Sequence, residues 1–194
     1  MTTTAALTHP HLRTLLADAE ATRTETECLR DTLTSAQLTW HPEPGVWSVA
    51  DCFEHLRKID KAYCRELPEA LSRAEPGDPP YRPGLFARWF IRLVSPESSF
   101  KVKTPKATRP KPTAEAASSE ALDRFLAQQA EVIDLIQRAD GKDINTGKLP
   151  SPLASILKFS VGEALTMLVR HEQRHLGQAQ RLTERADFPR AEAG

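Results

Sequence analysis

Four long segments of the chain carry apolar residues at the three- and four-residue spacing of an amphipathic helix. They cover about residues 9–33, 49–73, 114–139 and 160–185. Each has one apolar stripe, although the stripe of the first segment is moderate and its polar side is rich in Thr. Helices of this kind bury their apolar stripes against one another. The pattern therefore predicts an all-α protein built as a four-helix bundle.

Capping residues mark where two of these helices begin. Ser48, followed three residues later by Asp51, forms a capping-box pattern at the start of the second helix. Ser160 and Glu163 form the same pattern at the start of the fourth. Pro68 lies inside the second segment and is expected to kink that helix or end it early, because proline lacks the N–H of the helical ladder.

A proline-rich connection separates the second and third helices. Residues 74–113 hold eight of the fifteen prolines and show no strand-like alternation. Within this stretch, residues 84–94 are apolar enough for a short helix that either packs on its own bundle or meets a partner. Residues 101–112 carry five basic side chains and three prolines. That composition favours a solvated, extended connection over a site for an anionic substrate or a phosphate.

Length and composition fit a single domain over residues 1–194, with flexible tails at 1–8 and 188–194. The balance of 26 basic against 26 acidic side chains argues against binding to nucleic acid or to an anionic membrane. The chain contains no apolar run of about 18 residues and starts without the features of a signal peptide. Cys28, Cys52 and Cys64 lack metal-type clustering, as expected of reduced thiols. We therefore expect a cytoplasmic protein.

Two histidines one helical turn apart, His171 and His175, lie within the apolar stripe of the fourth helix. Their spacing brings both imidazoles to one face, where they can bind a single metal ion. An imidazole buried among apolar residues has ring nitrogens that need partners, at a cost of about 1–3 kcal/mol for each one unmet. A shared metal ion supplies such partners, so the pair predicts a metal site.

His55 is the best candidate for a third ligand. It lies on the flank of the apolar stripe of the second helix, from which a side chain can reach toward a neighbouring helix. His9, His11 and His41 fall in a terminal segment or a Pro-rich loop, where we expect exposed side chains that bind no metal. Three imidazoles leave open positions, as in catalytic centres, whereas structural zinc usually has four protein ligands. Zinc, nickel, iron and copper all accept imidazole, so the ligands do not identify the metal.

Other polar residues near these histidines could support the site. Gln178 follows His175 by three residues and could hydrogen-bond a ligating imidazole or a water on the metal, although a polar position at the bundle rim explains it equally well. Asp51 lies about one turn before His55 and could orient its ring, but its capping role also accounts for it. Cys52 lies on the core stripe and is expected to be a buried, inert thiol.

Three sequence elements resemble the DinB/YfiT-like family of metalloenzymes. In that family a Trp-Ser opens the second helix, a histidine follows eight residues after the Trp, and a His-x-x-x-His pair sits on the last long helix. Here these elements are Trp47-Ser48, then His55, then His171 with His175. The resemblance extends over nearly the whole length of the chain.

This resemblance implies an up-down-down-up four-helix bundle in which His55, His171 and His175 bind one divalent metal ion, often nickel or zinc, with iron as a further candidate. Characterised members include transferases that use a low-molecular-weight thiol such as bacillithiol or mycothiol, and a mycothiol-dependent isomerase. The resemblance thus implies a metal-dependent enzyme that transfers a thiol to a small electrophile. Arg170 and Arg174 could then bind a carboxylate of the thiol, although solvated side chains are favoured.

Three functions stay open at this point. The first is the metal-dependent enzyme, the second a metal-binding bundle with a stress or sensory role and no turnover, and the third a structural or dimerising bundle whose histidines are merely buried. A small-molecule substrate is the expected partner of the enzyme. A homodimer would use the first helix or the apolar segment 85–94.

Overall fold

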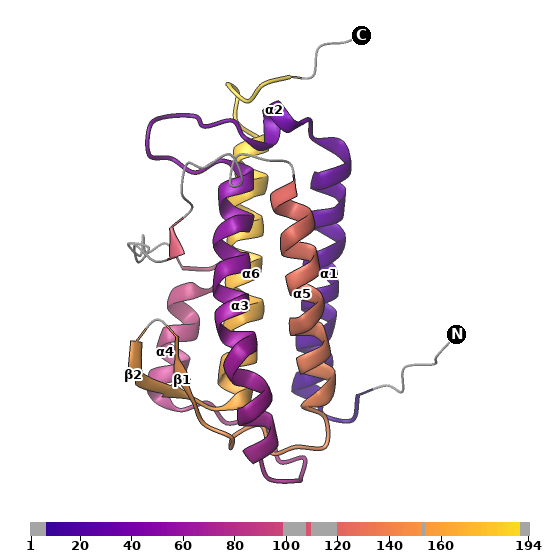
Figure 1. Cartoon of the computed structure of the whole chain (residues 1–194), viewed down its shortest axis with the longest axis vertical. Helices are drawn as coiled ribbons and strands as arrows, with labels where there is room; N and C mark the ends of the chain where they lie inside the picture. Colours follow the sequence, from indigo (N-terminus) through magenta and orange to yellow (C-terminus); the bar gives the residue numbers. More distant parts are fainter. Residues whose placement is uncertain (1–6, 99–107, 110–119, 153, 191–194) are drawn as a thin grey trace, which may run out of the picture.

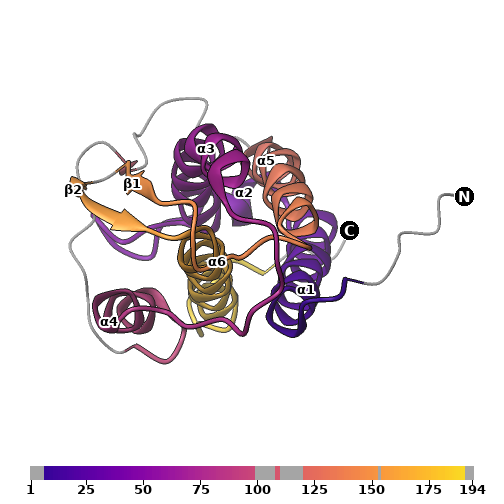
Figure 2. The ribbon, with the colours of Figure 1, turned by 90° about the horizontal axis from the view of Figure 1, so that it is seen from below.

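Four long helices form a bundle in this computed structural model, which describes residues 7–98, 108–109, 120–152 and 154–190. The helices are α1 (Pro10–Thr32), α3 (Val49–Arg73), α5 (Glu120–Arg138) and α6 (Val161–Thr183). α1 and α6 run in one direction and α3 and α5 in the other, so the order is up-down-down-up (Figure 1). Seen along the bundle, α3 and α1 each pack against both α5 and α6 (Figure 2). The predicted four-helix bundle is confirmed.

Both predicted capping boxes are present. The hydroxyl of Ser48 accepts from the backbone N–H of Asp51 at 3.1 Å, and the Asp51 carboxylate accepts from the N–H of Ser48 at 3.1 Å. Ser160 and Glu163 make the equivalent pair at 3.3 and 2.7 Å. A short helix, α2 (Ser35–Leu38), lies in the connection between α1 and α3. Because the caps fix where α3 and α6 begin, they also set the positions of the side chains that follow.

Pro68 does not end α3 early, as the sequence had allowed, because this helix continues to Arg73. The proline ring is exposed, whereas Leu67, Ala70 and Leu71 around it are buried. Burial of these apolar side chains stabilises the last turn by more than the loss of one backbone hydrogen bond on the solvent side costs. Tertiary packing therefore outweighs the local preference of proline.

The expectation of a purely helical protein needs a correction between α5 and α6. Strands β1 (Leu149–Ser151) and β2 (Ala154–Phe159) form a two-stranded antiparallel hairpin with Leu149 opposite Phe159. The hairpin segment contains two prolines and little alternation, so its sequence carries no strand signal. Aromatic packing against Phe159 stabilises the hairpin. The ring centroid of Phe159 lies 6.3 Å from that of Phe86 and 5.6 Å from that of Phe90.

The apolar segment predicted at 84–94 forms α4 (Leu85–Val94), which packs along α6 outside the bundle (Figure 2). Its Ala87 is buried, while Leu85, Phe86 and Trp89 are exposed. Most of the basic stretch 101–112, and residues 114–119 of the third predicted helix, lie outside the described residues. None of the described helices is both long and apolar enough to cross a membrane.

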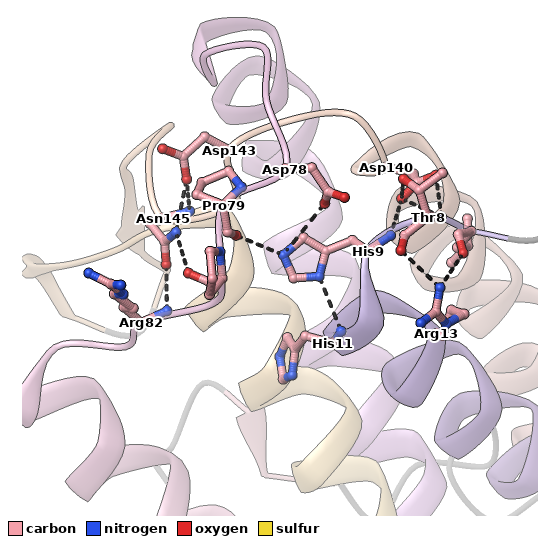
Figure 3. Close-up of polar contacts among 12 residues, drawn as sticks. Thr8, His9, His11, Arg13, Asp78, Pro79, Arg82, Asp140, Asp143 and Asn145 are labelled. Atoms are coloured by element: carbon pink, nitrogen blue, oxygen red, sulfur yellow. Dashed lines mark hydrogen bonds and ion pairs between the residues drawn. The ribbon is translucent and has the colours of Figure 1, made fainter.

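A polar network fixes the start of α1 (Figure 3). The carboxylate of Asp140 accepts from the backbone N–H groups of Thr8 and His9 at 2.9–3.1 Å. The Nδ1 of His9 accepts from the N–H of His11 at 3.1 Å, so His9 acts as the N-cap, and its Nε2 donates to the carbonyl of Pro79. The expectation of an exposed His9 was therefore wrong. Its ring is 2% exposed, because an imidazole with both nitrogens hydrogen-bonded can be buried.

Apolar packing in the bundle falls into two clusters separated by a buried polar layer. The lower cluster reaches up to Val132 on α5 and Val169 on α6, and the upper one begins at Leu126 and Leu176. Between them, in the same two helices, Gln129 and Glu172 are fully buried. The core is therefore not continuous along its length.

Gly147 is the glycine on which the junction between α3 and α6 depends. It adopts φ +62°, which disfavours any residue with a Cβ. A Cβ there would collide with the carbonyl oxygen of Ala70 and approach Val161 and Ala74 to 3.0 and 3.1 Å. Gly141 also has a positive φ, of +76°, but a Cβ at that position meets nothing within 4 Å.

We predict that Gly147→Ala lowers the free energy of unfolding by about 3 kcal/mol, from the left-handed backbone and the overpacking together. Gly141→Ala, the matched control, should cost about 1 kcal/mol from the backbone alone. Thermal unfolding measures both, with a fall of about 6–12 °C expected for Gly147→Ala. Equal shifts in the two variants would contradict the steric argument.

Candidate metal centre

Three histidines from two helices meet beside the bundle core. His55 comes from α3, and His171 and His175 come from α6. One potential ligand nitrogen on each ring lies within 4.8 Å of the corresponding atoms on the other two. The ring centroids are 4.7–5.2 Å apart and each pair of rings is steeply inclined. The three residues predicted from the sequence are therefore brought together.

Antiparallel packing of α3 against α6 explains this meeting. The i,i+4 spacing stacks His171 and His175 on one face of α6, and the register between the helices brings His55 opposite both. His55 and His175 are buried at 4% and 8% exposure, and His171 is half-buried. Interaction between the helices, rather than either helix alone, creates the cluster.

Hydrogen bonds fix the tautomer of two rings. His55 Nδ1 donates to the backbone carbonyl of Thr108 at 2.8 Å, and His175 Nδ1 donates to the side-chain oxygen of Gln178 at 3.1 Å. Because each Nδ1 carries the proton, the Nε2 of each ring keeps a free lone pair. Gln178 thus contacts a ring of the cluster, as one of its two proposed roles requires. The sequence did not predict the contact with Thr108, because a backbone carbonyl that is distant along the chain has no recognisable sequence pattern.

Asp51 has a different set of contacts. Its carboxylate accepts from the N–H of Ser48 and lies 3.6 Å from Nδ1 of His41, an exposed ring whose Nδ1 also bonds the carbonyl of Val46. Among the described residues it makes no contact with His55, whose Nδ1 is already taken by Thr108. The interactions of Asp51 are therefore those of a helix cap.

His171 differs from the other two histidines because its Nδ1 is buried and has no hydrogen-bond partner among the described residues. Leaving such a nitrogen unpaired costs about 1–3 kcal/mol. Burial, followed by the charges that His175 and His55 would carry, holds the pKa of His171 well below its usual value. This ring is therefore neutral and carries an unsatisfied polar atom.

The other two rings are neutral for a related reason. Burial, with the nearby His55 and Arg174 as smaller causes, lowers the pKa of His175 to about 3. Burial also lowers the pKa of His55, although its bond to the Thr108 carbonyl opposes the shift. All three imidazoles are therefore neutral, and a neutral imidazole is the form that binds a metal ion.

Trp47 forms one wall of the cluster. Its ring lies 5.0 Å from that of His55 and 5.6 Å from that of His175, nearly parallel to the latter at 25°. The half-buried indole stands at the start of α3, just before the Ser48 cap. It shields two imidazoles from solvent on that side and so lowers the local dielectric.

The two arginines beside the histidine pair have partners within the protein. Arg174 donates to the carbonyls of Ser95 and Ser98 at 2.9 and 2.8 Å and thereby holds the chain that leaves α4. Arg170 donates to Gln173 at 3.0 Å and lies 3.8 Å from the carboxylate of Asp18. Arg174 therefore ties α4 to the turn of α6 that carries the histidines.

A groove of ≈ 560 Å³ runs between α4 and α6. Arg170, which directly precedes His171, lines it, as do Tyr81, Trp89, Arg92, Ser95 and Thr166. Its volume is that of a small-molecule site. Cys52, by contrast, is fully buried, as predicted, and burial raises the pKa of its thiol.

Glu172 is the residue near this site that the sequence reasoning missed. With its neighbours it completes a His-Glu-x-x-His pattern, in which zinc proteases use the glutamate as general base. Here its carboxylate accepts from Nε2 of Gln129 on α5 at 2.8 Å and is fully buried. Burial raises its pKa to about 8, and burial with the charge of Glu172 raises that of Asp60 well above its usual value. Here the spacing brings both histidines into the cluster, while the glutamate bonds to Gln129 on α5.

Comparisons with known proteins agree with this architecture. The structure resembles that of YfiT from Bacillus subtilis, described as a probable metal-dependent hydrolase with an unusual four-helix bundle topology. The TM-score is 0.58 at 15% sequence identity, over 92% of this chain and 89% of that one, which shows a shared fold. No protein with a curated description matches the sequence. The DinB superfamily model matches residues 18–179, a span that includes all three histidines, and the chain therefore belongs to the DinB superfamily.

Proposed function

We propose that the protein is a divalent-metal-dependent enzyme in which His55, His171 and His175 hold the ion and a low-molecular-weight thiol is transferred to a small electrophile. The observation that carries the proposal is the unpartnered, buried Nδ1 of His171 within a cluster of neutral imidazoles. A ring nitrogen in that state fits a metal site or its immediate surroundings better than a packed core.

Three protein ligands leave coordination positions for small molecules, as catalytic sites require. A zinc or nickel ion supplies Lewis acidity there, which lowers the pKa of a thiol or water. The surrounding protein residues orient the imidazole rings and shield them from solvent. Thr108 and Gln178 hold two rings by their Nδ1 protons, and Trp47 shields them on one side.

Thiol transfer is favoured over hydrolysis by the surroundings of the cluster. Within the described residues no carboxylate forms a hydrogen bond or an ion pair with the three imidazoles, and Glu172 bonds to Gln129 instead. A bound metal ion lowers the pKa of water as well, but from about 15.7, so water needs a far larger decrease before it becomes a nucleophile. A thiol has a pKa near 8.5 and needs only a modest decrease to become a thiolate. Hydrolysis, the activity in the description of YfiT, is the second candidate.

Metal content tests the ligand set. Protein purified without an affinity tag and reloaded with zinc or nickel should bind one equivalent, measured by elemental analysis and by the rise in melting temperature. His171→Ala should weaken binding by more than the 10–100-fold that loss of an outer partner costs, and Gln178→Leu by about that amount. His41→Ala, which changes an exposed ring, is the control. No bound metal in the wild type, with unchanged stability in His171→Ala, would sink the metal hypothesis.

The depressed pKa values predict a pH dependence for the metal-free protein. His175 has a pKa of about 3 when folded, against an ordinary value of 6.5 for an exposed imidazole, so between these values the unfolded chain binds more protons. His175 should therefore contribute a fall of about 2–3 kcal/mol in the free energy of unfolding between pH 6.5 and 4.5, while Glu172, whose pKa is raised to about 8, acts in the opposite direction. Urea unfolding in the presence of a chelator measures this. His175→Phe should flatten the slope; an equal slope in both proteins would refute the assignment.

A fluorogenic electrophile separates the candidate activities. With monochlorobimane and a cellular thiol, the metal-loaded enzyme should form the conjugate at least about 100-fold faster than His55→Ala, because the variant lacks one of the three proposed ligands. Each power of ten in rate corresponds to about 1.4 kcal/mol of transition-state stabilisation. The His41→Ala control should keep the rate. Hydrolysis of p-nitrophenyl acetate without thiol, in place of conjugation, would favour a hydrolase. Bound metal without either activity would favour a non-catalytic metal-binding bundle.

A further inference from the structure

A second group of buried polar side chains lies in the bundle, distinct from the three histidines. Asp60 on α3, Gln129 on α5 and Glu172 on α6 are each 0% exposed. Four of their oxygens have no hydrogen-bond partner among the described residues: both carboxylate oxygens of Asp60, Oε1 of Gln129 and Oε1 of Glu172. Every one of these atoms is an acceptor.

The orientation of Gln129 is fixed by its neighbours. Its Nε2 donates to Oε2 of Glu172 at 2.8 Å and to the backbone carbonyl of Ala19 on α1 at 3.3 Å. Exchanging the amide nitrogen and oxygen would put an acceptor against two acceptors, so the assignment is chemically determined. The amide oxygen is therefore left as a buried acceptor beside Glu172. Because it belongs to an amide, it is an observation separate from the unpaired oxygens of the two acids.

The two acids lie at one level of the bundle. On α3, Asp60 lies between Leu56 of the upper apolar cluster and Tyr63 of the lower one, the level at which Gln129 and Glu172 interrupt the apolar packing of α5 and α6. Among the described residues neither acid forms an ion pair with Lys, Arg or His. Two buried acids thus lie in one layer of the bundle, and no cation among the described residues compensates them.

We propose that Asp60, Gln129 and Glu172 bind a second cation, a hard divalent ion such as Ca²⁺, Mg²⁺ or Mn²⁺, inside the bundle. The donor set consists of oxygens alone, which these ions prefer and which contrasts with the all-nitrogen set of the histidines. Two carboxylates balance a charge of +2. When both acids are ionised, a water molecule would satisfy two acceptors but would not balance the two negative charges, which a divalent cation does.

The test uses the full chain, stripped with a chelator and refolded from denaturant with or without CaCl₂, MgCl₂ or MnCl₂. Refolding in the presence of the ion is needed because the residues are fully buried. At least one ion at saturating concentration should raise the melting temperature by about 5 °C or more. Asp60→Asn and Glu172→Gln should abolish this rise, while Asp134→Asn, which changes an exposed acid on α5, should retain it.

The same measurement on His55→Ala separates this site from the histidine centre. The rise with Ca²⁺ or Mg²⁺ should persist in that variant, and crystals grown with Mn²⁺ should show an anomalous peak between Asp60, Gln129 and Glu172. A melting temperature that no ion changes in the wild type would overturn the proposal and leave protonation of the acids as the explanation. A rise that is lost in His55→Ala would overturn it too, because the effect would then belong to the histidines.

Discussion

The antiparallel contact between α3 and α6 is the constraint on which the site depends. It places His55 opposite the His171 and His175 pair, and neither helix could form the cluster alone. The capping boxes at Ser48 and Ser160 fix where each helix begins, and so they fix the register of every side chain that follows. A shift of one residue in either helix would rotate its histidines by about 100° and separate them.

Apolar packing on either side explains why the bundle tolerates so many buried polar groups. Apolar clusters above and below the polar layer supply most of the favourable burial, while the layer itself carries Asp60, Gln129 and Glu172. The histidine cluster and this layer both have unmet hydrogen-bonding capacity, at His171 and at the acceptor oxygens. A core selected for stability alone would fill these positions with apolar side chains. Their presence points to ligand chemistry.

Much of this was predictable from the sequence, because helical spacing and capping are local properties. The histidine pair follows from its i,i+4 spacing, and His55 from its place on a helix flank. Thr108 could not be predicted, because its contribution is a backbone carbonyl brought near His55 by the fold. The buried N-cap at His9 depends on distant loops. The β-hairpin depends on aromatic packing from α4.

Glu172 shows how one spacing can serve different chemistry in different folds. In a His-Glu-x-x-His helix the two histidines share a face, but the role of the glutamate depends on what packs against the face next to it. Here that neighbour is α5, whose Gln129 donates to the carboxylate and holds it inside the bundle. Among the described residues, the histidine cluster is thereby left without a carboxylate hydrogen-bonded to its imidazoles. Chemistry at such a centre suits a nucleophile that ionises readily, and a thiol meets that condition better than water.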